Sequence, residues 1–429
     1  MGAKNALICL GGGPSPVINA SLQGVLERCL AATDKMREVY CASHGIEGVL
    51  LEELIDMRQE DPRELARLRS TPASGAIGTC RYKLGAGREE DFDRILEVFK
   101  AHDIGYFFYI GGNDSMDTAD KVSELARQAG LELVAVGVPK TIDNDLGDEA
   151  CTIIDHTPGY GSAARYWANL IREVDEENRG ICVSECVSVF QAMGRAAGFL
   201  TAASRLADPG REMPLQLYLA ECSHSLEFLA ENVNRQLHES GRCIVVVNEG
   251  FDVGDIGARV DGFGHIEYGA SQKSACQGVV NYLNSVKLRA RGYANCQVPG
   301  VLQRCTGVQR SPVDVQEAYE VGLHGADLAL AGESGYMATI LREPGAAYRV
   351  RYDKVPLRVV ANSERFLPES WIAENRIDVT DDFVRYAAPL IGEGIAPLEF
   401  ENGILRFARL ERHMTAQRCP KYVPVGMRG

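Results

Sequence analysis

The sequence lacks the features that mark membrane proteins, secreted proteins and zinc proteins. No apolar run approaches the roughly 18 residues from which a membrane-spanning helix is recognised. The N-terminal stretch MGAKNALICLGGG has no long apolar segment with a small-residue cleavage site, so we interpret it as a first strand. The 13 cysteines are scattered without a C-x-x-C pair or a His/Cys ligand spacing. These absences predict a cytoplasmic protein with reduced cysteines and no membrane association.

Positive charge is also in short supply. The chain has 45 Lys and Arg against 59 Asp and Glu, which gives a formal net charge of −14. This balance disfavours general binding to nucleic acid or anionic membranes, and a phosphate ligand would need a local cationic pocket. The remaining composition, with 45% hydrophobic and 24% charged residues, indicates a soluble globular protein. At 429 residues, two domains are the default expectation.

A glycine-rich turn follows the first expected strand. The apolar run 6–10 (ALICL) leads into GGGPSP, and the helical spacing of apolar residues then predicts a helix over 17–32. The backbone N–H groups of such a turn, including that of Gly12, can approach phosphate oxygens. The turn matches neither G-x-G-x-x-G nor G-x-x-x-x-G-K-[ST], which disfavours a dinucleotide-binding fold or a P-loop NTPase.

Two more expected strands end in polar loops. The run 106–110 (YFFYI) is followed by GGNDS and a helix over 116–128, and the run 134–138 (VAVGV) is followed by PKTIDND. Parallel strands of an open α/β sheet bind ligands at their carboxyl ends. Lysine, hydroxyl and carboxylate groups suit phosphate chemistry, because they supply a cation for anionic oxygens, a base and a metal ligand. The simpler alternative is a polar loop in which Asp145 caps the next element.

The second half of the chain repeats the pattern of strands that end in polar groups. We expect strands at 182–190, 215–219 and 244–247, a further possible strand ending in PGVLQR at 299–304, and a helix over 314–331. The polar groups are Met193–Gly194–Arg195, Glu221 and Asn248–Glu249–Gly250. We therefore predict an α/β protein with domains at 1–150 and 151–345, followed by an extension at 346–429 of unclear role.

The order GGGPSP, GGNDS, PKTIDND, MGR, NEG and PGVLQR resembles the phosphofructokinase family over roughly residues 5 to 345. The chain is most similar to the pyrophosphate-dependent branch. This resemblance implies two Rossmann-like three-layer lobes with the active site in the cleft between them, the first lobe for pyrophosphate and the second for fructose 6-phosphate. It also implies reversible, Mg²⁺-dependent transfer of phosphate from pyrophosphate to the 1-hydroxyl of fructose 6-phosphate, by a homodimer or homotetramer.

Two positions distinguish the phosphate donor. ATP-using members have GGDGS and PGTIDND, and this chain has Asp114 and Lys140 in place of the two glycines. The resemblance implies that Asp114 stands where a nucleotide α-phosphate would lie, while Lys140 supplies a charge for pyrophosphate and for the transition state. Two like charges ~4 Å apart repel by about 4 kcal/mol at an effective dielectric constant of about 20, enough for roughly thousandfold exclusion of ATP.

The resemblance also implies roles for the other site residues. Asp143 matches the catalytic base that takes the sugar hydroxyl proton. Thr141, beside it in the sugar-phosphate site, and Ile142 are implied to bind substrate together with Asp143. Arg195 would face the transferring phosphoryl group, to which a planar guanidinium is well suited. The remaining implied contacts are with fructose 6-phosphate (Met193, Gly194, Arg195, Glu249 and Arg304, with Arg310 as an alternative to Arg304), with the donor (Gly12 and Arg81) and with Mg²⁺ (Asn113 and Asp145).

The chain departs from the family pattern at several points. Asn113 replaces a carboxylate at the magnesium position. An amide is a weaker magnesium ligand, so metal binding would depend on Asp145 or Asp114. Val301 stands where the branch often has tyrosine, and the stretch before MGR has no arginine that could enter a neighbouring subunit's site. Two alternatives stay open: a kinase of the same fold that uses ATP or another acceptor such as sedoheptulose 7-phosphate, and a non-catalytic sugar-phosphate-binding subunit.

Overall fold

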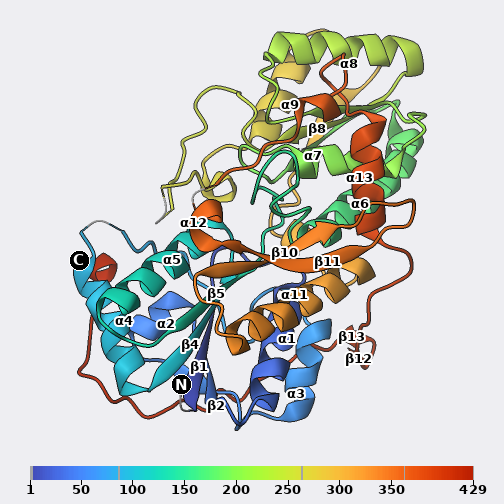
Figure 1. The fold of residues 1–429 in the computed structure, drawn as a ribbon. Helices are drawn as coiled ribbons and strands as arrows, with labels where there is room; N and C mark the ends of the chain where they lie inside the picture. Colours follow the sequence, from blue (N-terminus) through green and yellow to red (C-terminus); the bar gives the residue numbers. More distant parts are fainter. Residues whose placement is uncertain (1–2, 86, 262–263, 362, 429) are drawn as a thin grey trace.

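The computed structural model describes residues 3–85, 87–261, 264–361 and 363–428, which form two α/β lobes stacked one above the other in Figure 1. The first lobe is built on a seven-stranded sheet with the order β11-β10-β5-β4-β1-β2-β3, and the second on a four-stranded sheet with the order β7-β8-β6-β9. Neighbouring strands run parallel except β3 against β2 and β11 against β10. The predicted α/β fold is confirmed.

The strands of the first sheet are β1 (Lys4–Leu10), β2 (Met36–Ala42), β3 (Leu54–Asp56), β4 (Ile104–Gly111), β5 (Val134–Pro139), β10 (Tyr336–Arg342) and β11 (Val350–Pro356). Those of the second sheet are β6 (Glu185–Ala192), β7 (Leu215–Tyr218), β8 (Cys243–Asn248) and β9 (Tyr293–Gln297). The short strands β12 (Phe400–Glu401) and β13 (Ile404–Leu405) form a separate hairpin.

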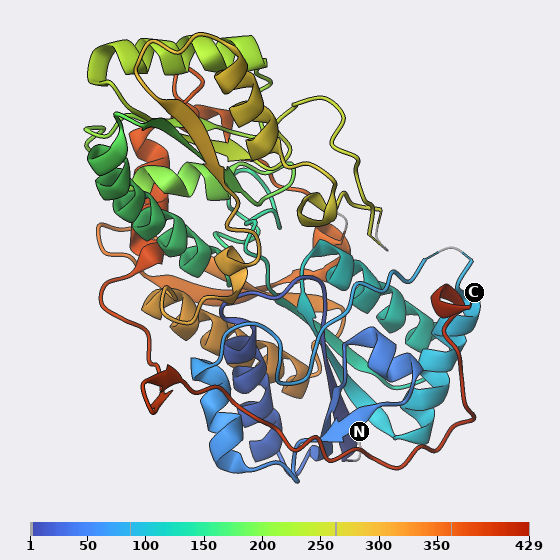
Figure 2. The same ribbon diagram turned by 180° about the vertical axis from the view of Figure 1, so that it is seen from behind.

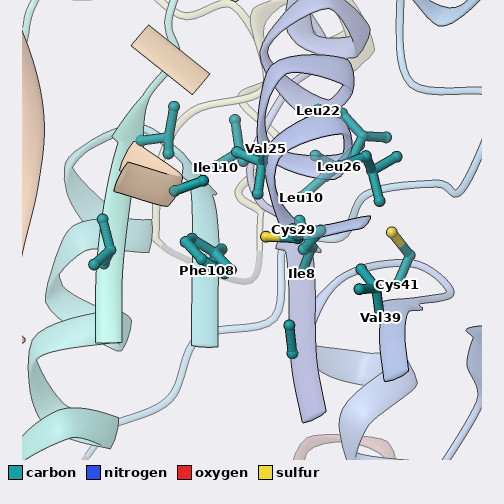
Figure 3. Packing of buried hydrophobic residues seen from close by; sticks show 14 of the residues in the cluster. Ile8, Leu10, Leu22, Val25, Leu26, Cys29, Val39, Cys41, Phe108 and Ile110 are labelled. Carbon is teal, nitrogen blue, oxygen red and sulfur yellow. The ribbon is translucent and has the colours of Figure 1, made fainter. Parts of the chain in front are cut away.

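Helices cover both faces of the first sheet, which is why its central strands are almost continuously apolar. Ile8 and Leu10 of β1 pack beneath Leu22 and Val25, and Figure 3 shows this layer of side chains between helix and sheet. The side chain of Leu7 belongs to the opposite layer. The helices are α1 (Ile18–Ala31), α3 (Pro62–Arg67) and α11 (Pro312–Leu330) on one side, and α2 (Ile46–Leu50), α4 (Glu89–Ala101), α5 (Asn113–Gln128) and α12 (Leu357–Val360) on the other.

Helices α1 and α11 approach each other so closely that each carries a glycine at the crossing. A Cβ atom on Gly24 would lie 2.1 Å from the carbonyl oxygen of Tyr319, and one on Gly322 would lie 2.3 Å from that of Ser21. Larger side chains at these positions would force the helices apart. This contact fixes α11 to the first lobe, although α11 follows the second lobe in the sequence.

The second sheet is also covered on both faces. Phe190 and Ile244 face one layer, and Val189 and Val245 face the other. Helices α6 (Tyr160–Ile181), α7 (Phe199–Ala203) and α13 (Asp381–Ile391) lie on the first side, and α8 (Leu226–Ser240) and α9 (Ala275–Ser285) on the second. The lobe is therefore a second three-layer α/β unit.

The lobes do not follow the boundaries predicted at 150 and 345. After the second lobe the chain returns through α11 to β10, which pairs with β5 in the first sheet, and β11 then adds the edge strand. The predicted unit 151–345 is thus divided between the two lobes. The reason is a long-range parallel pairing, with α11 as its crossover helix, that local sequence patterns do not indicate.

The predicted extension at 346–429 has no core of its own and contributes to both lobes. Its helix α13 packs on α6 in the second lobe. The following chain runs back along the outside of the first lobe, as Figure 2 shows. There the backbone N–H of Thr415 donates to the carbonyl of Leu54, and that of Val425 donates to the carboxylate of Asp91.

Two predicted elements differ from those observed in the structure. The helix expected over 116–128 begins at Asn113, because Asn113 and Asp114 are favourable residues in a first helical turn. The strand expected to end at 299–304 is wrong. β9 ends at Gln297, and Leu302–Cys305 is the short helix α10. Val301 and Leu302, the apolar pair within PGVLQR, are each 56% exposed. No helix in the described residues is long and apolar enough to cross a membrane.

Candidate active site

The polar loops after β1, β4 and β5 meet at one edge of the first sheet, because these strands are parallel neighbours. Together with loops of the second lobe they line a cavity of about 370 Å³. All predicted site residues line this cavity except Gly194 and the alternative Arg310: Gly12, Arg81, Asn113, Asp114, Lys140, Thr141, Ile142, Asp143, Asp145, Met193, Arg195, Glu249 and Arg304. Residues from both lobes therefore surround a single space.

Cations gather at the glycine turn after β1. The Lys140 ammonium donates a hydrogen bond of 2.6 Å to the carbonyl oxygen of Gly13. A Cβ atom on Gly13 would lie 2.7 Å from Nη1 of Arg304 and 3.6 Å from Nη2 of Arg81. Gly12 has φ of +72°, which a residue with a side chain adopts only with strain. The turn thus holds its backbone among positive charges, as an anion site requires.

Lys140 is only 3% exposed although it carries a titratable ammonium. Burial and then the nearby charge of Arg304 lower the pKa of Lys140 to about 7, although Asp143 and Asp145 act in the opposite direction. The surroundings of the Lys140 ammonium supply too little negative charge to balance it. The ammonium would gain from an anionic ligand that supplies this charge.

Asp143 and Asp145 stand on either side of Asn144 in the turn after β5. The guanidinium of Arg195, which comes from the second lobe, lies 3.9 Å from Oδ2 of Asp143 and 3.7 Å from Oδ2 of Asp145. The Thr141 hydroxyl accepts a hydrogen bond from the backbone N–H of Asp143 and donates one to Asp145. Burial and the charge of Asp145 raise the pKa of Asp143 to about 6, in the range suited to a general base.

The turn that carries Arg195 is held by Glu249. Gly194 has φ of +124° and Arg195 has φ of +50°. Oε1 of Glu249 accepts hydrogen bonds from their backbone N–H groups at 3.1 and 3.0 Å. Burial, followed by the charge of Asp143, raises the pKa of Glu249 to about 7. Glu249 therefore shapes the turn as well as lining the cavity, and Gly194 lies behind the cavity wall.

The comparisons with known proteins agree with this arrangement. A family model described as phosphofructokinase matches residues 5–329. The chain belongs to the phosphofructokinase family. It is 38% identical to the pyrophosphate–fructose 6-phosphate 1-phosphotransferase of Halomonas elongata over 98% of this chain and 100% of that one. It is 40% identical to the enzyme of that name from Methylococcus capsulatus over 92% of this chain and 94% of that one.

A solved structure of the family has the same architecture. The pyrophosphate-dependent phosphofructokinase of Nitrosospira multiformis matches with a TM-score of 0.87 and 35% identity, over 98% of this chain and 100% of that one. The Halomonas elongata and Nitrosospira multiformis proteins each match over 98% of this chain, so their similarity extends into the C-terminal part. The sequence motifs assign no role to that part. The two-lobe arrangement described above is therefore that of a phosphofructokinase.

The cavity of this phosphofructokinase is also lined by several carboxylates. Asp114, in the first turn of α5, lines it, and burial raises the pKa of Asp114. Across the cavity, Nη1 of Arg81 lies 2.9 Å from Oδ2 of Asp261 and also pairs with Glu267. No sequence pattern indicates these second-lobe partners of Arg81, because they lie more than a hundred residues further along the chain.

The two predicted magnesium ligands differ in how far their polar atoms are already engaged. Asn113 donates from Nδ2 to the carbonyl of Ser363 and accepts at Oδ1 from the backbone N–H of Asp114. Asp145 accepts only from Thr141 among the contacts described above. Nearby, Oδ1 of Asp143 is buried without a hydrogen-bond partner in the described residues. No group of three or more His, Cys, Asp or Glu in the described chain could hold a metal alone.

The two arginines predicted as alternatives for binding the sugar phosphate lie in different environments. Arg304 lines the cavity at the end of the PGVLQR stretch. Arg310 is fully buried elsewhere and donates to the carbonyls of Arg69 and Pro397 at 2.7 and 2.8 Å. Arg310 is therefore a structural residue, and Arg304 is the one that a ligand can reach.

Gln303 is a site residue that sequence reasoning missed. It is 1% exposed, and its Oε1 accepts hydrogen bonds from the backbone N–H of Met193 and from the indole of Trp167. Through these contacts it ties the short helix α10 to the MGR turn. The residue type alone could not reveal this role, since glutamine is usually a surface residue.

Proposed function

We propose that this protein transfers a phosphoryl group from pyrophosphate to the 1-hydroxyl of fructose 6-phosphate, giving fructose 1,6-bisphosphate and phosphate, and that the reaction is reversible. The observation that carries the proposal is the buried Lys140 ammonium, which lies on the glycine turn and in the same cavity as Asp143. A small phosphate donor could bind at this glycine turn without a separate site for a nucleoside. The names of the relatives at 38% and 40% identity support the same reaction.

Asp143 acts as the general base. Its carboxylate takes the proton of the 1-hydroxyl as that oxygen attacks the nearer phosphorus, and the bond to the bridging oxygen breaks to release phosphate. Lys140 and Arg195 hold the negative charge of the phosphoryl oxygens during transfer, when electrostatic stabilisation contributes most. The pKa of about 6 for Asp143 keeps the base ionised at neutral pH in the free enzyme.

We assign Mg²⁺ to the carboxylate of Asp145 in the PKTIDND turn, which leaves Asp143 free to act as the base. The oxygen atoms of Asp145, one of which accepts a hydrogen bond from Thr141, fit a hard cation, which prefers oxygen ligands. Such an ion, held partly by the pyrophosphate itself, would neutralise charge on the donor. Asn113 contributes at most indirectly, because both ends of its amide are engaged within the protein.

Donor choice rests on Asp114. Its carboxylate lines the cavity where the first turn of α5 begins, and a nucleotide would have to bring its own negative charge close to it. Like charges at ~4 Å repel by about 4 kcal/mol at an effective dielectric constant of about 20. The first lobe would therefore take pyrophosphate, and the second lobe would take fructose 6-phosphate through Arg195, Arg304 and the MGR turn.

A donor and acceptor screen tests the proposal. Purified protein is given Mg²⁺, either pyrophosphate or ATP, and either fructose 6-phosphate or sedoheptulose 7-phosphate, and bisphosphate formation is measured. We expect turnover with pyrophosphate and fructose 6-phosphate, and a rate with ATP that is lower by about a thousandfold. Turnover with ATP alone would make this a nucleotide-dependent kinase. Binding of sugar phosphate without turnover would make it a non-catalytic subunit.

The proposal includes a cytoplasmic homodimer or homotetramer. Free cysteines throughout the described chain fit a reducing compartment. Val298, Val301 and Leu302 are 44%, 56% and 56% exposed beside the cavity, which is the kind of apolar surface that association covers. Sedimentation velocity of the native protein measures the state directly.

A further inference from the structure

A short C-terminal segment, Ser363–Leu367, touches loops of both lobes at the active site. The carbonyl of Ser363 accepts from Asn113 in the GGNDS loop. The backbone N–H of Arg365 donates to the carbonyl of Asp145 at 2.7 Å, and that of Leu367 donates to Glu221 in the second lobe. The segment lies beyond residues 5–329, which the family model matches. Its contacts nevertheless concentrate on the catalytic loops.

Arg365 makes the most concentrated of these contacts. Its side chain is fully buried, and within the described residues it forms no ion pair with a carboxylate. Nε donates to the carbonyl of Asn144 at 2.7 Å, and Nη2 donates to Oδ1 of the same residue at 2.5 Å. Nη1 donates to the carbonyls of Ile154 and Asp155 at 2.8 and 3.1 Å. All of these acceptors belong to the chain that follows the catalytic base.

Asn144 is the residue whose conformation sets the directions of Asp143 and Asp145. It has φ of +57°, in the left-handed region that side-chain-bearing residues seldom adopt. Its side chain is satisfied on both ends, since Oδ1 also accepts from the backbone N–H of Thr157 and Nδ2 donates to the hydroxyl of Tyr386. The turn is therefore held by partners outside itself. Arg365 bonds both the carbonyl and the side chain of Asn144, and its backbone N–H bonds the carbonyl of Asp145.

We infer that Arg365 is a positioning residue for phosphoryl transfer: it fixes the turn at Asn144 so that Asp143 and Asp145 both face Arg195. Arg365 does not line the cavity, so it acts through the turn and not by touching substrate. A guanidinium suits this task because its donors form a rigid planar fork, which can bond the backbone and side chain of one asparagine together. The expected effect of Arg365 on kcat rests on the proposed function, whereas its effect on the conformation of the turn does not.

The chain offers a matched control in Arg310. It is also fully buried and bonds carbonyl oxygens, but these belong to Gly307, Arg69 and Pro397, away from the catalytic turn. Loss of either guanidinium leaves buried acceptors without donors and lowers stability. Only loss of Arg365 should disturb the carboxylates.

The test compares Arg365→Ala, Arg365→Lys and Arg310→Ala in the full-length protein. We expect kcat to fall about a hundredfold in Arg365→Ala with KM for pyrophosphate within about threefold, because misplacement of a reacting group by ~1 Å has that effect. Guanidinium chloride at a sub-denaturing concentration should restore part of kcat, and the same concentration of sodium chloride should not. Arg365→Lys keeps the positive charge but lacks the planar fork of donors, so its kcat should remain at least tenfold below the native value. Arg310→Ala should keep the native kcat.

Amide hydrogen exchange provides a readout that does not depend on the reaction. Peptides covering residues 141–157 should exchange faster in Arg365→Ala and Arg365→Lys than in native protein, and should be unchanged in Arg310→Ala. Native-like exchange in both Arg365 variants would overturn the inference even if the native protein proved inactive with pyrophosphate. So would native kcat in Arg365→Lys, or a loss in folded Arg365→Ala that guanidinium leaves untouched.

Discussion

The low pKa of Lys140 gives the donor site a pH dependence that can be measured. In the free protein the pKa of Lys140 is lowered to about 7, chiefly by burial and then by Arg304, and that of Asp143 is raised to about 6. Donor capture needs the ammonium charged and the base ionised. The pH dependence of kcat/KM for pyrophosphate reports these free-protein values, so its optimum should lie between the two.

The size of the effect follows from these two values. Above the pKa of Lys140, each unit of pH lowers the charged fraction about tenfold, so kcat/KM should be about tenfold lower at pH 8 than at its maximum. The limiting kcat should decline later, because bound pyrophosphate supplies negative charge that raises the pKa of Lys140. A difference between the two profiles is thus part of the prediction.

The assay measures initial rates of fructose 1,6-bisphosphate formation across pH 5 to 9 at constant ionic strength. Lys140→Met serves as the comparison, because it keeps the length of the side chain and removes its charge. Pyrophosphate ionises identically with both proteins, so the ratio of native to variant kcat/KM isolates the contribution of Lys140. That ratio should be large at pH 6 and shrink as pH rises through about 7. A ratio that stays constant from pH 6 to 9 would refute the reasoning.

Three further changes test other parts of the structure. Asp143→Asn should lower kcat by about 10²–10⁴-fold without unfolding, as measured by steady-state rates and circular dichroism, and native-like turnover would remove Asp143 as the base. Asp114→Gly combined with Lys140→Gly should raise ATP use relative to pyrophosphate in the donor screen; an unchanged preference would count against charge exclusion. Gly24→Ala should cost about 1–3 kcal/mol in urea unfolding because its Cβ meets a carbonyl of α11 at 2.1 Å. The control Gly180→Ala, with nothing within 4 Å, should not destabilise, and equal stability of the two variants would contradict the close helix contact.

Much of the site could be predicted because its residues are grouped in short loops. Glycine turns and polar runs after apolar strands are local patterns, and parallel strands bring their carboxyl ends together. The loops with Gly12, Asp114 and Lys140 therefore lie in one cavity as expected. The order of the motifs along the chain added the second-lobe side, including Arg195 and Arg304.

The remaining features depend on contacts between distant parts of the chain. The pairing of β10 with β5 joins residues about two hundred positions apart, and no local pattern reports which sheet an apolar strand will enter. The role of Arg365 is hidden for the same reason, since an arginine in a mixed segment is most often exposed. Glu249 was found in the right place, but its hydrogen bonds to the backbone of the MGR turn appear only in three dimensions.

The cavity residues and their supports come from distant parts of the sequence. Lys140 and Asp143 come from the first lobe and Arg195 from the second, and Arg365 bonds the turn at Asn144 from the segment Ser363–Leu367. The left-handed turn at Asn144 is bonded by Arg365 and Tyr386 as well as by Thr157, so the strand β5 that precedes it does not hold it alone. If Asp143 and Asp145 act as we propose, we therefore expect changes that loosen the packing of the C-terminal part of the chain to disturb these carboxylates as well.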